Sequence, residues 1–218
     1  MKKENYQAMA QKIMEKHQGE AKRPTLLLHA CCAPCATVPL VDLSSYFDMG
    51  VYYYNPNIWP EEEAKLRADE LLRFVASYPF DHPPQVMVAP YDAKPFWDCI
   101  VGWEHEPEGG KRCERCFALR LQETARMARE KGFDYFTTTL SISPHKDAVL
   151  LHRLGLEAAE EAGVTYLPAD FKKKGGTLRS VGFSKTYALH RQDYCGCVFS
   201  KKEAQARRKE TNERIGDV

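Results

Sequence analysis

The chain has 218 residues, a hydrophobic content of 44%, a charged content of 28% and a net charge of +1. These values are typical of a globular protein with one sizeable core, and they exclude a disordered or fibrous chain. Because no apolar stretch reaches the roughly 18 residues of a membrane span and the polar N-terminus lacks a signal-peptide core, we expect a cytoplasmic protein with no membrane partner.

Apolar strands alternate with amphipathic helices through most of the chain. An amphipathic helix is predicted within residues 1–22. Five strands follow: Thr25–Ala30, Val51–Tyr54, Gln85–Val88, Phe133–Leu140 and Val164–Leu167. Helices are predicted between them, starting near Cys35, Pro60, Phe96, Cys113 and Ser143, with Gly50 ending the first strand–helix unit. This alternation predicts an α/β fold with a doubly wound parallel sheet of about five strands.

The last fifty residues are basic and helical and show no clear strand. Between Phe171 and Lys209, eleven Lys and Arg stand against Asp193 and Glu203, so this segment carries +9 in a chain of +1. Such asymmetry indicates a polyanion such as nucleic acid, although solvated helix faces explain it equally well. We therefore expect an N-terminal helix at 1–22, an α/β core at 23–170 and a basic helical extension at 171–218.

The end of the first predicted strand is rich in sulfur. The apolar run 26–28 leads into Cys31, Cys32 and Cys35, and Pro34 suits the first turn of a helix. In open α/β sheets, ligands bind outside the carboxyl ends of the strands. Many nucleotide-binding proteins fill this turn with glycines and hydroxyls that bind phosphate. Sulfur at this place indicates metal or redox chemistry instead.

Eight cysteines are present, and in a reducing cytoplasm they indicate metal binding or catalysis rather than a disulfide scaffold. Cys99 stands alone in an aromatic stretch, so we interpret it as a small buried apolar residue. The other seven form three groups at turns or helix starts: Cys31, Cys32 and Cys35; Cys113 and Cys116; Cys195 and Cys197. Seven exceed the four that a structural zinc needs, which favours an iron–sulfur cluster. The last group could alternatively be a dithiol that cycles to a disulfide.

Six separate motifs resemble the cobalamin-independent epoxyqueuosine reductases of the QueH type. They extend from about Leu26 to Ser200: HACCAPC at 29–35, NPN at 55–57, EPEGGKRCERC at 106–116, TTTLSISP at 137–144, DFKK at 170–173 and YCGC at 194–197. The resemblance implies an adenine-nucleotide-hydrolase-like (HUP-like) fold and a 4Fe–4S cluster. It also implies the last step of queuosine synthesis, which reduces the epoxide of epoxyqueuosine, at the wobble position of tRNA, to an alkene.

The same resemblance assigns roles to the cysteines. The implied cluster ligands are Cys31, Cys32, Cys113 and Cys116, and the implied redox pair is Cys195 and Cys197. Family members vary at the position of Cys35, which makes this residue a candidate ligand of a second, mononuclear iron. The implied partners are a tRNA that contains epoxyqueuosine and an external electron donor.

Converting an epoxide to an alkene takes two electrons and two protons and releases the oxygen as water, so a proton donor is needed. His29, next to the first cysteines, is the first candidate, followed by His145 and Lys146. A structural hydrogen bond or simple exposure is the competing interpretation of all three.

Further polar and aromatic residues are candidates for substrate binding. Loop-end groups suited to the cyclopentanediol or base are Asn55, Asn57, Ser143 and Lys146, although turn formation explains such residues as well. Phosphate binding is assigned to Lys172, Lys173 and Arg179. Trp59, Tyr91 or Trp97 is a candidate for stacking on an extruded base, although an aromatic residue in such a chain more often belongs to the core.

Two other functions fit parts of the pattern. A zinc-stapled tRNA-binding module without catalysis would use the same cysteines and basic segment. An ATP-using tRNA-modifying enzyme of the same fold is disfavoured, because the turn after the first strand lacks a Ser-Gly-Gly-x-Asp-Ser phosphate loop. Iron and zinc contents separate the reductase from the zinc module.

Overall fold

The computed structural model describes residues 5–19 and 22–216. Five strands form one sheet in the order β3-β2-β1-β4-β5, and each neighbouring pair is parallel. The strands are β1 (Thr25–His29), β2 (Asp48–Tyr53), β3 (Gln85–Val88), β4 (Tyr135–Thr138) and β5 (Thr165–Tyr166). The predicted parallel sheet of about five strands is confirmed.

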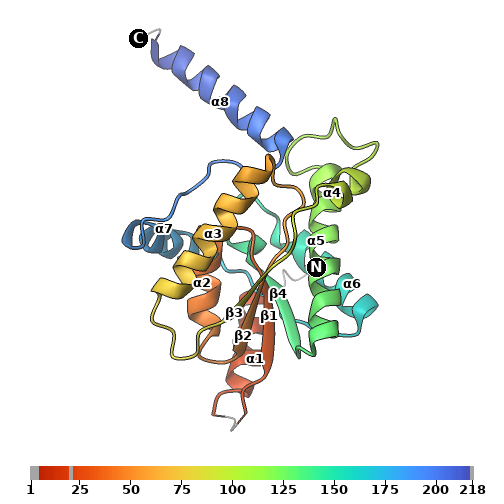
Figure 1. Cartoon of the computed structure of the whole chain (residues 1–218), viewed down its shortest axis with the longest axis vertical. Coiled ribbons are helices and arrows are strands. Elements are labelled where there is room, and N and C mark those ends of the chain that lie inside the picture. The colour runs from red at the N-terminus through yellow and green to blue at the C-terminus, as the bar shows by residue number, and fades with distance from the viewer. Residues whose placement is uncertain (1–4, 20–21, 217–218) are drawn as a thin grey trace.

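Helices precede, connect and follow the strands (Figure 1). They are α1 (Tyr6–Lys16), α2 (Ala33–Leu43), α3 (Glu61–Ser77), α4 (Lys94–Cys99), α5 (Lys111–Lys131), the 3₁₀ helix η1 (Thr139–Ile142), α6 (Ala148–Ala162), α7 (Gly176–Thr186) and α8 (Val198–Gly216). The N-terminal helix α1 is shorter than the predicted 1–22 segment, of which residues 1–4 and 20–21 lie outside the described residues.

The sheet separates two apolar cores because successive side chains of a strand point to opposite faces. Leu26 and Leu28 of β1 pack into the core that α2 and α3 cover. Leu27, between them, packs into the core formed with α5 and α6. All three leucines are fully buried, as expected for a central strand of a parallel sheet.

The strand order places a crevice between β1 and β4. The connection from β1 enters α2 on one face, and the connection from β4 leads to α6 on the other face. In an open α/β sheet this switch of direction opens a space outside the carboxyl ends of the two strands. The first cysteine group follows β1 directly, so it lies at this crevice.

Three boundaries differ from the sequence-based predictions. Gly50 lies inside β2 rather than ending a unit, because a Cβ there would come within 2.5 Å of the Phe133 ring, so glycine is needed for packing. The fourth strand ends at Thr138, whose side chain accepts a hydrogen bond from Leu140 and caps η1. The following helix begins only at Ala148, because Asp147 caps it.

The C-terminal segment is helical, as predicted. Helix α7 packs on α2, while α8 projects away from the body for most of its length (Figure 1). None of the helices in the described part of the chain is both long and apolar enough to cross a membrane.

Candidate metal centre

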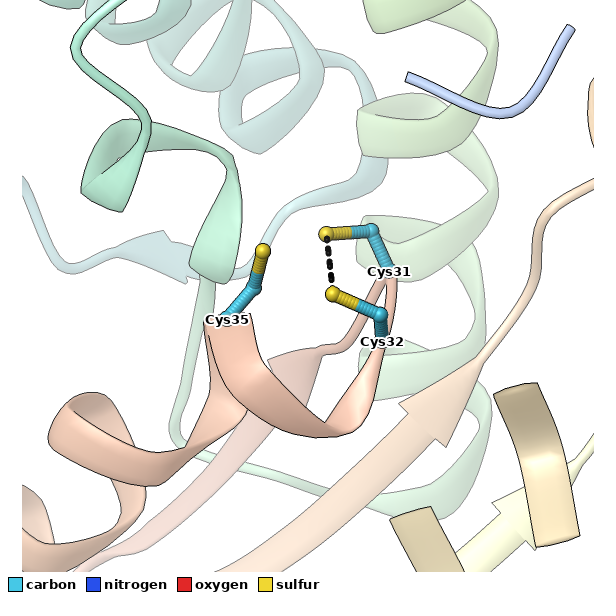
Figure 2. Close-up of side chains that lie close together, drawn as sticks. All are labelled: Cys31, Cys32 and Cys35. Atoms are coloured by element: carbon cyan, nitrogen blue, oxygen red, sulfur yellow. Dashed lines mark hydrogen bonds between the residues drawn. The ribbon is translucent and has the colours of Figure 1, made fainter. Parts of the chain in front are cut away.

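The first cysteine group forms a compact triad after β1. Cys32 has extended backbone angles and stands at the N-cap of α2, with Pro34 in the first helical turn. This places Cys31 before the helix and Cys35 within its first turn. The three Sγ atoms lie within 4.8 Å of one another and face a common point (Figure 2). Three convergent thiols at this spacing can hold one soft metal ion.

The triad is electrostatically prepared to carry negative charge. Hydrogen bonds from Cys32 and Cys35 hold the pKa of the Cys31 thiol well below its usual value, although burial opposes this. The same interactions raise the pKa of Cys32 and of Cys35. Thr139, the first residue of η1, donates a further hydrogen bond to Cys31 Sγ at 3.5 Å. Hydrogen bonding within the triad therefore favours negative charge on Cys31 over Cys32 and Cys35.

A second group of sulfurs comes from α5 and from the segment before α8. Because α5 runs antiparallel to the strands, its N-terminus lies at the same sheet edge as the triad. Four cysteines line one small pocket together with Asn57: Cys113, Cys116, Cys195 and Cys197. We call these four the second sulfur group. Cys116 and Cys197 are buried, and burial raises the pKa of Cys116 to about 12.

Backbone contacts fix the loop that carries Cys195 and Cys197. Gly196 has φ +129°, which favours glycine, and its carbonyl accepts a hydrogen bond from the Trp59 amide at 3.0 Å. Arg67 donates to the Cys195 carbonyl at 3.1 Å. The Gly196 amide in turn donates to Ser200 Oγ at 3.2 Å. Elements far apart in sequence therefore hold this loop at the sheet edge.

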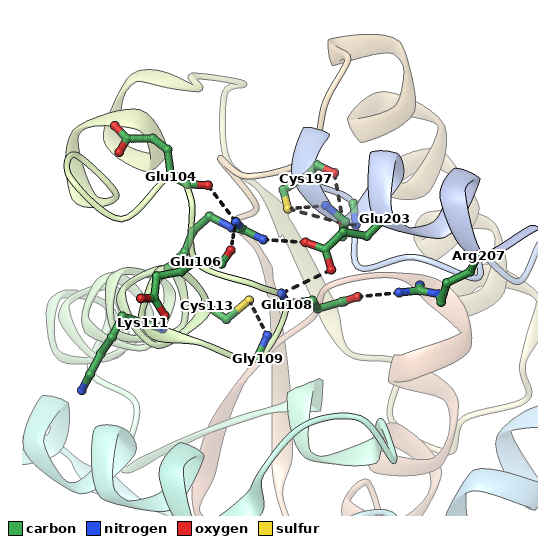
Figure 3. A network of polar contacts seen from close by, with 12 residues as sticks. Glu104, Glu106, Glu108, Gly109, Lys111, Cys113, Cys197, Glu203 and Arg207 are labelled. Carbon is green, nitrogen blue, oxygen red and sulfur yellow. Dashed lines mark hydrogen bonds and ion pairs between the residues drawn. The ribbon is translucent and has the colours of Figure 1, made fainter. Parts of the chain in front are cut away.

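A polar network joins the start of α8 to the loop that precedes Cys113 (Figure 3). The guanidinium of Arg112 is buried and pairs with Glu203 at 3.0 Å. It also donates to the carbonyls of Glu104 and Glu106 and lies over the Phe199 ring. Glu203 accepts a second bond, from the Glu108 amide. Gly109, next in this loop, donates its amide to Cys113 Sγ at 3.3 Å.

Two positive groups lie near both sets of sulfurs. Arg120, one turn after Cys116 on α5, is 1% exposed. Burial disfavours its charge, but the sulfurs of Cys116, Cys195, Cys31 and Cys113 outweigh this and raise the pKa of its guanidinium. Lys146, in the segment that follows η1, is half-buried. Burial disfavours its charge, but the sulfurs of Cys195, Cys31 and Cys35 outweigh this and raise the pKa of Lys146. The two sulfur groups therefore share one electrostatic environment.

His29 is fully buried at the end of β1. Its Nε2 lies 3.1 Å from the Tyr54 carbonyl, which can only accept, and its Nδ1 lies 2.9 Å from the Thr138 hydroxyl. Burial, together with the positive charge of Arg120, lowers the pKa of His29 to about 4. This geometry makes His29 a neutral residue that links β1 to β4.

The predicted substrate residues divide into buried and surface groups. Asn55 is buried and bonded to the Ala30 carbonyl and to Arg120, while the Oδ1 of buried Asn57 has no partner among the described residues. Ser143 accepts a bond from the His145 amide, as expected of a turn former. Of the phosphate candidates, Lys172 pairs with Asp170 and Arg179 pairs with Asp42, whereas Lys173 is exposed.

The aromatic candidates and Cys99 are exposed or only partly buried. Trp59 and Trp97 are exposed at 46% and 43%. Lys201 lies over the Trp59 ring, and the Trp97 ring makes edge contacts with Phe96 and Phe199. Tyr91 is only half-buried, with its hydroxyl bonded to the Ile58 carbonyl. Cys99 is half-buried rather than buried and packs beside Cys116 and Cys197.

The sequence analysis missed the buried arginines. Arg67, Arg112 and Arg120 are each at most 3% exposed, although arginine is almost never fully buried without a partner. The one available signal was spacing, because Arg112 precedes Cys113 and Arg120 follows Cys116 by one helical turn.

Comparison with known proteins agrees with this geometry. The family model described as epoxyqueuosine reductase QueH matches residues 26–203. The chain belongs to the QueH family of epoxyqueuosine reductases. It is 40% identical over 200 residues to QueH of Streptococcus pyogenes, which covers 91% of this chain and 78% of that protein. It is 38% identical to QueH of Haemophilus influenzae over 91% of this chain and 80% of that protein. QueH of Thermotoga maritima is 31% identical over 89% of this chain and 99% of its own length.

The match to the QueH family includes both sulfur groups and the three buried arginines, Arg67, Arg112 and Arg120. Residues 26–203 begin in β1, before the triad, and end at Glu203, the residue that anchors α8. Nearly all of the projecting part of α8 lies outside the match.

Proposed function

We propose that this chain reduces the epoxide of epoxyqueuosine in tRNA to the alkene of queuosine, with a 4Fe–4S cluster bound by its cysteines. The observation that carries the proposal is the meeting of seven sulfurs at one edge of the sheet, in two groups that act on the same buried Arg120. The relatives named epoxyqueuosine reductase supply the substrate. The strand order agrees with the HUP-like fold, which is part of this proposal.

The sulfurs present fit such a cofactor. Cysteine thiolates are the usual ligands of iron–sulfur clusters, four for each 4Fe–4S cluster. The four cysteines of the second sulfur group surround one pocket, and the triad offers three more within 4.8 Å of one another. A cluster bound here would supply the two electrons that the epoxide takes up.

Two assignments of the cysteines compete. The resemblance assigns the cluster to Cys31, Cys32, Cys113 and Cys116, and leaves Cys195 and Cys197 as a redox pair. The spatial grouping instead favours a cluster in the second sulfur group and a mononuclear iron in the triad with Cys35. We propose the second assignment, because these four cysteines line one pocket, whereas the sulfurs within 4.8 Å of one another are those of the triad.

Residues around the sulfurs are suited to the remaining chemistry. The reaction consumes two electrons and two protons, breaks both carbon–oxygen bonds of the epoxide and releases water. Lys146 is the better-placed proton donor, because the sulfurs of Cys195 and Cys31 lie near its amino group, whereas both nitrogens of His29 are occupied. Asn57 lines the pocket of the second sulfur group, and its buried Oδ1, which has no partner among the described residues, is an unused hydrogen-bond acceptor beside that pocket.

Anaerobic purification with iron, sulfide and zinc analysis tests this function, followed by incubation with epoxyqueuosine tRNA and a chemical reductant. We expect a brown protein that contains iron and sulfide and forms queuosine. Stoichiometric zinc without iron would instead support the zinc module.

The two cysteine assignments are separated by Cys195→Ser and Cys197→Ser, with Cys99→Ser as the control. If the second sulfur group holds the cluster, both variants lose iron and turnover, while Cys99→Ser keeps both. Loss of turnover with full iron content would contradict our assignment and restore the redox pair.

A further inference from the structure

Arg120 is a buried cation without the usual partner. It is the largest fully buried side chain of the described residues, and no carboxylate pairs with it in that part of the chain. Nε donates to the Cys116 carbonyl at 3.3 Å and Nη1 to Asn55 Oδ1 at 3.3 Å. Nη2 is buried and makes no hydrogen bond. Removing a charge from water without a counter-charge costs several kcal/mol, roughly, so this arrangement requires a reason.

The surroundings of Arg120 indicate what balances its charge. The guanidinium is bonded to the Cys116 carbonyl and, through Asn55, to Ala30 next to Cys31, so it lies between the two sulfur groups. Burial disfavours its charge, but sulfurs of both groups raise its pKa. Cysteines bind metals as thiolates. A metal centre held at this edge therefore brings several negative charges into the space that Arg120 faces.

The guanidinium is also held in a fixed orientation. Asn55 accepts the bond from Arg120 and donates its own amide to the Ala30 carbonyl at 2.9 Å. Ala30 directly precedes Cys31, so one side chain connects the end of β1 with the cation on α5. The free Nη2 remains available as a donor.

We propose that Arg120 is a positioning residue that supplies the fixed positive charge against which the metal centre is held and reduced. The inference rests on the proposed iron–sulfur function. Adding an electron to a buried, negatively charged centre is unfavourable, and a cation in the same low-dielectric interior reduces this cost. Charge and hydrogen bonds to sulfur are the means by which proteins set cluster potentials.

The first test measures the midpoint potential of the cluster in Arg120→Met, Arg120→Gln and Arg120→Lys by anaerobic redox titration. Arg126→Gln is the matched control, because Arg126 is an exposed arginine of α5 that pairs with Glu123 and Glu130. We expect a lower potential in the Met and Gln variants, an intermediate one in the Lys variant and no change in the control. Arg120→Gln keeps hydrogen-bonding capacity, so it provides the measurement if Arg120→Met does not fold.

The second test needs no cluster. In the metal-free protein Arg120 is an uncompensated charge, so Arg120→Met should unfold at the same or a higher urea concentration than wild type. The loaded variant should lose its iron to a chelator faster than loaded wild type.

Lower stability of the metal-free variant, together with an unchanged potential, would show a purely structural role and overturn the inference. A wild-type protein without iron would overturn the cluster proposal itself, whereas a loaded wild type with equal potentials in all variants overturns only the role of Arg120.

Discussion

At the residue scale, the loop between Cys195 and Cys197 depends on the absence of a side chain at Gly196. Its φ of +129° disfavours other residues, and a Cβ would lie 3.0 Å from Ile58 and 3.1 Å from Arg67. The same Arg67 holds the Cys195 carbonyl. Backbone strain and crowding caused by a side chain at position 196 would therefore displace the sulfurs of both Cys195 and Cys197.

We expect Gly196→Ala to destabilise the protein by about 1–3 kcal/mol and to reduce turnover strongly. Gly182 of α7 is the control, because a Cβ there meets nothing within 4 Å. Gly182→Ala should leave turnover unchanged and raise stability by roughly 0.5–1 kcal/mol, since alanine is the better helix former. Urea unfolding and queuosine formation measure both effects, and full turnover in Gly196→Ala would show that the loop tolerates displacement.

Single residues also show what the sequence could not reveal about the site. The cysteines were identifiable because their chemistry is specific and their spacing regular. The grouping of Cys195 with Cys113 depends on how the last fifty residues return to the sheet edge, which no local pattern encodes. The burial of Arg120 was hidden for the same reason, because a lone arginine on an amphipathic helix is normally expected on its exposed face.

At the scale of elements, α8 is attached near its start by the buried Arg112–Glu203 pair and by a longer, more exposed pair between Arg207 and Glu108. Arg112 is 3% exposed and Glu203 is its carboxylate partner. Beyond Ala204, the described side chains of α8 through Thr211 are exposed. The root of the helix therefore carries most of the attachment that the structure describes.

Replacing Glu203 by Gln should leave the Arg112 charge buried and weaken the root of α8. We expect a loss of about 1–3 kcal/mol in the free energy of unfolding, less than for a fully buried pair because Glu203 is partly exposed. Urea unfolding measures the loss, and Glu210→Gln on the exposed part of α8 should change stability by no more than about 0.5 kcal/mol. Equal stabilities of the two variants would contradict the anchoring role.

The elements themselves were largely predictable, and the errors have physical causes. All five strands were found, because the apolar runs of a doubly covered sheet are continuous. Gly50 was misinterpreted because glycine usually breaks a strand, whereas here it makes room for Phe133. The strand around residues 133–140 was predicted too long, since threonine favours strands and also caps helices, as Thr138 does.

At the scale of the whole molecule, fewer basic side chains of residues 171–209 are free to bind a polyanion than the sequence suggests. Arg179 is neutralised by Asp42, and Lys172 by Asp170. Lys173 is exposed, with no ion pair among the described residues. Phosphate binding by this segment should therefore rely on the exposed Lys173 and Lys174 more than on the paired Lys172 and Arg179.

We expect Lys173→Gln to weaken tRNA binding by roughly three- to tenfold at low salt and to reduce the salt slope by about one. Arg179→Gln should have a smaller effect on binding. Lys131→Gln, at the end of α5 remote from the sulfurs, should have none. Filter binding over a range of salt concentrations measures the three affinities, and an equal loss in Lys131→Gln would show that only net charge matters.

The distance in sequence between the two sulfur groups has a consequence for biogenesis. Cys31 precedes Cys195 and Cys197 in the chain, and four of the five strands lie between Cys31 and Cys195. These strands are therefore synthesised, and can begin to pair, before the last two thiols exist. A metal centre that needs Cys195 or Cys197 can be loaded only after that point, and the early thiols of a nascent polypeptide are open to oxidation until then.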